Sequence, residues 1–300
     1  MPLSVAFLGL GAIGAPMAGH LARSDHQLTI WNRTGGKAQV SVAAAAGARI
    51  ATSPADAVRL ADIVVTCLPQ SSDVAELLAA DDHAMANALR SGVLLVDCTS
   101  GDPETSRRIA NDLGARGVGF IDAPVSGGVA GAEAGTLTVM VGGGAAALER
   151  ARPVLDCFAG KIVHCGEIGA GDALKAVNNA LLALHIWSTA EGLVAAMNAG
   201  VAPQVALDVI NASSGRSNAS MNLFPDRVLT GAFPRTFRLA LLDKDAGIAA
   251  AMARSQKFPS PALQLAADLM RMAHLELGDD VDHVEAVKLV ERWSGVELRA

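Results

Sequence analysis

The feature that most restricts this chain is a glycine-rich turn close to its start, in the segment FLGLGAIG at residues 7–14. A short apolar run at residues 5–8 leads into the turn, and an alanine-rich stretch at residues 12–23 follows it. This order predicts a strand, a tight turn and a helix. A chain that begins in this way is expected to continue as β-α-β units on a parallel sheet.

Short apolar runs alternate with alanine-rich stretches as far as Cys165, which is typical of a doubly wound α/β domain. With 300 residues the chain has room for two domains. Strands are expected at residues 5–8, 28–31, 63–67, 93–97, 119–122, 137–141 and 162–165. Helices are expected between them at residues 12–23, 37–46, 72–79, 103–114 and 145–158.

Strand signals stop after residue 171, where a helix of about 28 residues is expected to begin, more than twice the mean helix length. We therefore expect a Rossmann-type domain at residues 1–165, an all-helical domain at residues 166–300, and a long helix joining them. Polar residues interrupt the apolar stretch at residues 173–197, which favours a buried helix over a membrane span. Further helices are expected at residues 203–213, 221–230, 239–255, 261–277 and 282–294.

Composition excludes several classes of protein. The hydrophobic fraction is 51% and the charged fraction 18%, which argues against a disordered chain. A net charge of −6 without a basic stripe makes nucleic acid an improbable partner. The four cysteines are widely spaced, the seven histidines show no metal-ligand spacing, and the start of the chain lacks a basic signal region. We expect a cytoplasmic protein with no metal site.

The glycine turn predicts a dinucleotide site, because its spacing is G-x-G-x-x-G between a strand and a helix. The first glycine allows the tight turn, the second lets a pyrophosphate approach the backbone, and the third lets helix and strand pack closely. A turn without a ligand is the alternative. The residues expected to hold the pyrophosphate are Gly9, Leu10, Gly11, Ala12, Ile13 and Gly14.

The end of the second expected strand bears on which dinucleotide is bound. An acid about 20 residues after the turn would bind the ribose hydroxyl of NAD. The chain instead has Asn32, Arg33 and Thr34, where a guanidinium would bind a 2′-phosphate. NADP is therefore favoured over NAD, with an ordinary exposed arginine as the alternative.

Two further segments carry groups suited to a small carboxylate. Ser126, Gly127 and Gly128 follow an expected strand and offer a hydroxyl group and backbone N–H donors. Lys175 and Asn179 stand four residues apart at the start of the long helix and share one of its faces. A buried lysine has a lowered pKa suited to acid–base chemistry, whereas a lysine that reaches solvent is the structural alternative.

Four ordered motifs together resemble the β-hydroxyacid dehydrogenase family. They are FLGLGAIGAPMAGHL at residues 7–21, DAPVSGGVAGAEAGTLTVMVGGG at residues 122–144, GAGDALKAVNN at residues 169–179, and the pair Lys244-Asp245. The resemblance implies an NAD(P)-dependent enzyme that interconverts a small 3-hydroxy acid and its semialdehyde.

The resemblance also assigns roles to residues. Lys175 would be the general acid/base, and Asp245 would close the site from the helical domain. Substrate would be held by Ser126, Gly127, Gly128 and Asn179. Ser100 and Lys244 would lie near the cofactor, Ser100 replacing the usual threonine, and Leu68 and Pro69 would line its adenosine-ribose side.

The members of this family differ in substrate, and the sequence favours two of them. The segment SSGR at residues 213–216 resembles 3-hydroxyisobutyrate dehydrogenases, whereas Asn32-Arg33-Thr34 resembles NADPH-dependent glyoxylate/succinic semialdehyde or tartronate semialdehyde reductases. A catalytically silent NADP-binding module is the remote alternative. The apolar composition also suggests a homo-oligomer, a homodimer or homotetramer, that contacts neither membrane nor nucleic acid.

Overall fold

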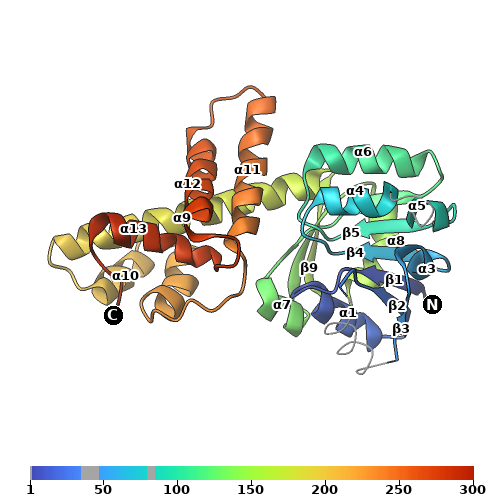
Figure 1. The fold of residues 1–300 in the computed structure, drawn as a ribbon, viewed down its shortest axis with the longest axis horizontal. Helices are drawn as coiled ribbons and strands as arrows, with labels where there is room; N and C mark the ends of the chain where they lie inside the picture. Colours follow the sequence, from blue (N-terminus) through green and yellow to red (C-terminus); the bar gives the residue numbers. More distant parts are fainter. Residues whose placement is uncertain (1, 35–46, 80–84) are drawn as a thin grey trace. The chain divides into compact units, whose positions relative to one another are not determined.

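The computed structural model describes residues 2–34, 47–79 and 85–300 of the chain. The described residues form two compact units, residues 1–175 and residues 176–300. The long helix α9 (Ala170–Asn198) carries the division between them (Figure 1). The boundary expected at 165/166 precedes this helix, whereas the units divide inside it.

Unit 1 is built on one sheet with the strand order β3-β2-β1-β4-β5-β6-β8-β7, in which β9 pairs with β8. Strands β1 to β6 run parallel to one another, and β8 runs antiparallel to β6. The order 3-2-1-4-5-6 is that of a dinucleotide-binding sheet, so the expected fold class is confirmed. The strands are β1 (Ser4–Leu8), β2 (Gln27–Trp31), β3 (Arg49–Ile50), β4 (Ile63–Thr66), β5 (Leu94–Asp97), β6 (Gly119–Asp122), β7 (Val125–Ser126), β8 (Leu137–Gly142) and β9 (Ala159–Gly166).

Helices cover both faces of the sheet (Figure 1). Neighbouring residues of a strand point to opposite sides, so each strand packs against both layers of helices. Val5 and Phe7 pack with α1, α7 and α8, whereas Ala6 and Leu8 pack with α3 to α6. This two-sided burial explains why the strands are continuously apolar. The helices are α1 (Gly14–Ala22), α3 (Pro54–Val58), α4 (Ser71–Ala79), α5 (Met85–Ala88), α6 (Pro103–Gly114), α7 (Gly128–Ala134) and α8 (Ala145–Leu155).

The expected elements of unit 1 agree with the observed ones to within a few residues. The helix expected at residues 37–46 lies outside the described residues. Five short elements were not anticipated, namely β3, β7, α3, α5 and α7. Each has seven residues or fewer, too few to show a clear periodicity in sequence.

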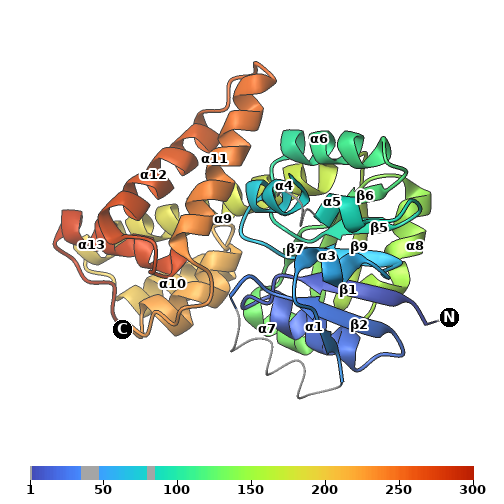
Figure 2. The same cartoon turned by 45° about the vertical axis from the view of Figure 1, so that its right-hand side comes forward.

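Unit 2 is helical across its described residues, and α11 and α12 lie side by side in it (Figure 2). Its core includes Trp187 of α9, Leu207, Phe224 and Met270. The elements after α9 are α10 (Pro203–Ala212), η1 (Ala219–Val228), α11 (Leu239–Ser255), α12 (Pro261–Leu277), η2 (His283–Ala286) and α13 (Val287–Ser294).

Two expected helices of unit 2 have a different local structure. The helix expected at residues 221–230 is a π-helix, η1, with Pro225 inside it. Proline lacks an N–H donor, which disfavours a regular α-helix at this point. The helix expected at residues 282–294 is divided into the 3₁₀-turn η2 and α13, and Asp282 and Glu285 form a capping box at the start of η2.

Helix α9 is long and apolar enough to cross a membrane by length and composition alone, with a mean hydropathy of 1.4. However, Ala180, Ile186, Trp187 and Leu193 of this helix all belong to the apolar core of unit 2. Its apolar character is therefore explained by packing within a folded unit.

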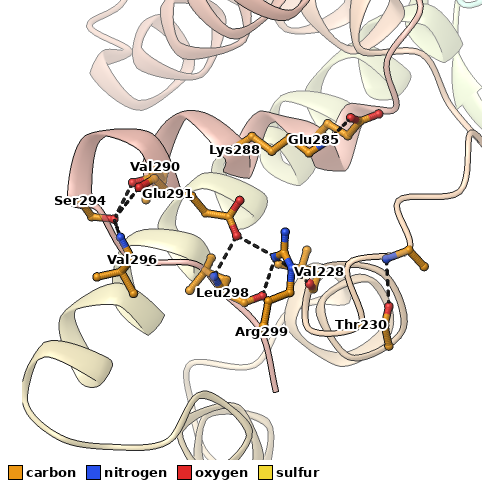
Figure 3. A network of polar contacts seen from close by, with 11 residues as sticks. Val228, Thr230, Glu285, Lys288, Val290, Glu291, Ser294, Val296, Leu298 and Arg299 are labelled. Carbon is orange, nitrogen blue, oxygen red and sulfur yellow. Dashed lines mark hydrogen bonds and ion pairs between the residues drawn. The ribbon is translucent and has the colours of Figure 1, made fainter.

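The end of the chain is fastened to the rest of unit 2 by a polar network (Figure 3). Arg299 pairs with Glu291 at 2.7 Å and donates to the carbonyl oxygen of Val228 at 3.2 Å. The Leu298 N–H also donates to Glu291, at 2.8 Å, while the Leu298 side chain is fully buried. The last residues thus hold α13 against the end of η1.

Candidate active site

The glycine turn has the shape that a pyrophosphate requires. Gly9 has a φ of +101°, and a Cβ there would overlap the carbonyl oxygen of Cys67. A Cβ on Gly14 would overlap the carbonyl oxygen of Gly9, whereas a Cβ on Gly11 would meet nothing within 4 Å. The open side of Gly11 and the absence of an acid from the first turn of α1 suit an anion at this helix N-terminus.

The end of β2 is tied to this turn by Asn32. Its side-chain oxygen accepts the N–H of Leu10 at 2.9 Å, and its amide nitrogen donates to the carbonyl oxygen of Thr34 at 2.7 Å. The guanidinium of Arg33 is 74% exposed and lies 3.9 Å from Asp73 at the start of α4. Leu10, Asn32 and Thr34 are thus brought together, and Arg33 extends beside them.

The loops after β4 and β5 are joined at the carboxyl edge of the sheet. The N–H of Leu68 donates to the Thr99 hydroxyl at 3.0 Å, and Pro69 next to it is exposed. Ser100 is half-buried and follows Thr99 directly. The structure therefore places the expected cofactor residues Leu68 and Ser100 on neighbouring loops.

The second glycine pair lies where β7 leads into α7. Ser126 is half-buried, while Gly127 and Gly128 are exposed and have φ values of +139° and +65°. A Cβ at Gly127 would also press on Leu137. These backbone conformations favour glycine and turn the chain sharply after Ser126.

A cluster of buried carboxyl groups lies behind these loops and was not assigned from the sequence. Asp97 and Asp122 end the neighbouring strands β5 and β6 and are paired in register. The third member, Asp172, stands in the first turn of α9. The sequence signal that could have revealed this cluster is that Asp97 and Asp122 each end an apolar strand.

Burial in this cluster disfavours the charged forms. It raises the pKa of Asp97 to about 6, against hydrogen bonds from Thr99 and Thr66 that lower it. It also raises the pKa of Asp172 well above its usual value, and the charge of Asp122 acts in the same direction. The pKa of Asp122 is raised by burial too.

Lys175 follows Asp172 by one turn of α9 and is half-buried. Asn179 follows by one further turn and is 3% exposed. Residues four apart in a helix share a face, so α9 presents a cation and an amide on one side. An amine and an amide so arranged suit a small oxygen-bearing ligand.

In unit 2, Asn179 is held by the Lys244-Asp245 pair. Its amide nitrogen donates to the Asp245 carboxylate at 2.6 Å, and the Lys244 ammonium pairs with the same carboxylate at 2.9 Å. Asn178 donates to the side-chain oxygen of Asn179 at 3.1 Å. The resemblance gave separate roles to Asn179, Lys244 and Asp245, and in the structure a hydrogen bond and an ion pair join these three side chains.

Comparison with known proteins agrees with this geometry. Residues 4–166 match the family model for the NAD-binding domain of 6-phosphogluconate dehydrogenase. Residues 169–290 match the model for the NAD-binding part of NADP-dependent 3-hydroxyisobutyrate dehydrogenase.

Individual relatives span nearly the whole chain. The 2-(hydroxymethyl)glutarate dehydrogenase of Eubacterium barkeri is 33% identical over 297 residues, 99% of this chain and 97% of that protein. The 3-hydroxyisobutyrate dehydrogenase of Pseudomonas aeruginosa is 36% identical over 89% of this chain and 91% of that protein. A solved structure of the Mycobacterium tuberculosis 3-hydroxyisobutyrate dehydrogenase with L-serine has a TM-score of 0.87 and 33% identity, covering 97% of this chain and 99% of that one.

A doubly wound sheet with a glycine turn, followed by a helical unit, defines an oxidoreductase that uses a nicotinamide dinucleotide. Within that class, the chain belongs to the β-hydroxyacid dehydrogenase family. This membership makes it an NAD(P)-dependent 3-hydroxyacid dehydrogenase.

Proposed function

We propose that this protein interconverts a small 3-hydroxy acid and its semialdehyde, with 3-hydroxyisobutyrate as the favoured substrate and Lys175 as the general acid/base. The observation that carries the proposal is the placement of Lys175 and Asn179 one turn apart on α9, with Asn179 buried and fixed by Asp245. Relatives that act on 3-hydroxyisobutyrate and 2-(hydroxymethyl)glutarate support this substrate class.

In the proposed reaction, proton transfer is the role of Lys175. Lys175 takes the proton from the substrate hydroxyl during oxidation and returns it to the carbonyl oxygen during reduction. Its side chain is half-buried in the first turns of α9. Hydride transfer to and from the carbinol carbon is the chemistry that a bound nicotinamide would supply.

The remaining groups bind and orient the substrate. The amide of Asn179 faces the reacting oxygen, where a hydrogen bond stabilises the negative charge that develops on it. The Ser126 hydroxyl and the N–H groups at Gly127 and Gly128 hold the carboxylate. The residues that would hold the cofactor are Ser100, Leu68, Pro69 and Lys244.

We further propose that NADP is preferred over NAD. Asn32 is neutral and engaged with Leu10, so the end of β2 presents no carboxylate toward a ribose 2′-phosphate. The guanidinium of Arg33 is exposed and lies 3.9 Å from Asp73, a long ion pair that a phosphate group could replace. The same residues favour an NADPH-dependent semialdehyde reductase as the second candidate function.

A substrate panel tests both candidates. The purified protein is assayed with 3-hydroxyisobutyrate, serine, glycerate and threonate for oxidation, and with glyoxylate and succinic semialdehyde for reduction, each with both nicotinamide cofactors. The highest kcat/KM for 3-hydroxyisobutyrate is the expected result. A preference for glyoxylate or succinic semialdehyde with NADPH favours the second candidate. Cofactor binding without turnover of any compound contradicts both.

A further inference from the structure

The first turn of α9 is held against the sheet by Asp122. This carboxylate accepts the N–H of Gly169 at 2.7 Å and the N–H of Asp172 at 3.0 Å. A Cβ on Gly171 would overlap the carbonyl oxygen of Met140, so only a glycine permits this close approach. The start of the helix therefore has one fixed position relative to β6 and β8.

The same turn is held from a second side by Asp172. Its carboxylate accepts the N–H of Gly101 at 3.0 Å and the hydroxyl of Ser106 at 2.6 Å. Both partners belong to the segment that leaves β5 and forms α6. Asp172 is 1% exposed, and a Cβ at Gly101 would lie 3.2 Å from its carboxylate.

These two contacts of Asp172 join the segment that carries the expected cofactor residue to the helix that carries the proposed acid/base. Gly101 directly follows Ser100, the expected cofactor residue, and Lys175 is one helical turn after Asp172. One buried side chain thus fixes the spacing between the loop of Ser100 and the turn of Lys175. A shift of about 1 Å in such spacing costs about 100-fold in rate in well-ordered active sites.

We propose that Asp172 is a positioning residue that holds the Lys175 turn of α9 in register with the Ser100 loop, and so supports proton transfer without touching the substrate. The proposal rests on the proposed role of Lys175.

Burying the carboxyl group of Asp172 costs free energy, and apolar packing alone does not explain why a carboxyl group occupies this position. Desolvation raises the pKa of Asp172, and the charge of Asp122 raises it further. Burying a polar group costs free energy unless hydrogen bonds satisfy it. The retained carboxyl group is accounted for by the two donors that it brings together.

A double-mutant cycle tests the proposal on the full-length protein. The variants are Asp172→Ala, Lys175→Ala and the combination of the two. Asp172→Asn is the conservative variant, because its amide oxygen can accept from Gly101 while its nitrogen donates to the Ser106 hydroxyl. The measurements are kcat, KM for the hydroxy acid, the dissociation constant of the cofactor, the pH profile of kcat and the melting temperature.

Asp102→Ala is the matched control. Asp102 lies in the same segment, and its carboxylate caps α6 by accepting the N–H groups of Glu104 and Thr105. Its loss lowers the melting temperature through the cap alone and leaves kcat within about twofold.

The expected result is a fall in kcat of about 10- to 100-fold for Asp172→Ala with KM changed less than threefold, as expected when an interaction acts only in the transition state. Asp172→Asn restores kcat to within about threefold of the wild type, because it keeps both hydrogen bonds. In the Lys175→Ala background, Asp172→Ala produces no further loss.

Other outcomes overturn the positioning role. An unchanged kcat in Asp172→Ala, or a loss that adds in full to that of Lys175→Ala, shows that Asp172 does not act through the lysine. An Asp172→Asn variant as slow as the alanine variant, with a shifted pH profile, shows that charge and not geometry matters. If Lys175→Ala itself keeps normal kcat, the proposed function fails first.

Should Asp172→Ala not fold, Ser106→Ala serves instead, since it removes one of the two donors. It is expected to lower kcat about threefold to tenfold in the wild-type background and not at all in the Lys175→Ala background. An equal loss in both backgrounds contradicts the proposal.

Discussion

The side chain of Asn179 donates a 2.6 Å hydrogen bond to the carboxylate of Asp245, and the two residues are 3% and 2% exposed. Asp245 also pairs with Lys244 at 2.9 Å. The amide of Asn179 is therefore oriented by a buried charge, with its oxygen accepting from Asn178. An amide held in this way is preorganised, which reduces the entropy cost of binding a ligand.

This relationship predicts the effect of removing Asp245. Asp245→Ala frees the Asn179 amide and removes the carboxylate that pairs with Lys244 at 2.9 Å, so KM for the hydroxy acid is expected to rise about tenfold or more. Asp245→Asn retains an acceptor for Asn179 and is expected to have the smaller effect. Steady-state kinetics with saturating cofactor measures both, and equal KM values for all three proteins contradict the role of Asp245.

Cofactor choice is tested at Arg33. Arg33→Ala removes the guanidinium expected to bind the 2′-phosphate, so the dissociation constant for NADPH should rise about tenfold while that for NADH stays within twofold. Arg235→Ala is the matched control, since Arg235 is also exposed and paired with an aspartate, Asp280, at 3.0 Å. Equal weakening of both cofactors by Arg33→Ala rejects the preference for NADP.

Much of unit 1 was predictable because its signals are local. The glycine turn at residues 9–14 and the apolar strands carry their own periodicity, and the strand order follows from the fold class. Helices α6, α11 and α12 also begin and end as expected. By contrast, η1 depends on how Pro225 is accommodated in the packed unit, which no periodicity shows.

The sequence could predict candidate residues for the site, but not the hydrogen bonds that join them. The sequence named Lys175, Asn179 and Asp245 as candidates, but it gave no sign of the bond between Asn179 and Asp245, which are 66 positions apart. The carboxyl cluster at Asp97, Asp122 and Asp172 was missed for the same reason. Its members are brought together by the sheet register and by the start of α9, not by spacing in the sequence.

The end of the chain is expected to contribute to stability. Leu298 is fully buried beside the Arg299–Glu291 pair, so Leu298→Ala should lower the free energy of unfolding by about 2 to 5 kcal/mol. Leu275→Ala is the matched control because Leu275 is 75% exposed, and its effect should stay within about 0.5 kcal/mol. Urea denaturation compares the variants, and equal effects contradict the anchoring of the C-terminus.

The stability of unit 2 should also depend on pH through His274. This imidazole lies between Asp243 at 2.7 Å and Asp279 at 2.6 Å, and the hydrogen bonds that it donates to both carboxylates raise its pKa above 6.5, that to Asp243 contributing most. A raised folded pKa gives a contribution that is complete below pH 6.5 and is lost as the pH rises through the folded pKa.

His274→Gln is therefore expected to lower the free energy of unfolding more at pH 5.5 than at pH 9. Denaturation of the wild type and the variant at both pH values measures this difference. A deficit that is the same at both pH values, or larger at pH 9, shows that the charged form is not the one stabilised.

The most direct test of the proposed mechanism is the rate of hydride transfer in Lys175→Ala, measured together with the dissociation constant of the cofactor. General acid–base catalysis contributes about 10²- to 10⁴-fold, so kcat with the preferred hydroxy acid should fall by at least 100-fold. The melting temperature and the cofactor affinity should remain close to those of the wild type. A Lys175→Ala protein that binds cofactor normally and turns over at a near-normal rate contradicts the assignment of this lysine.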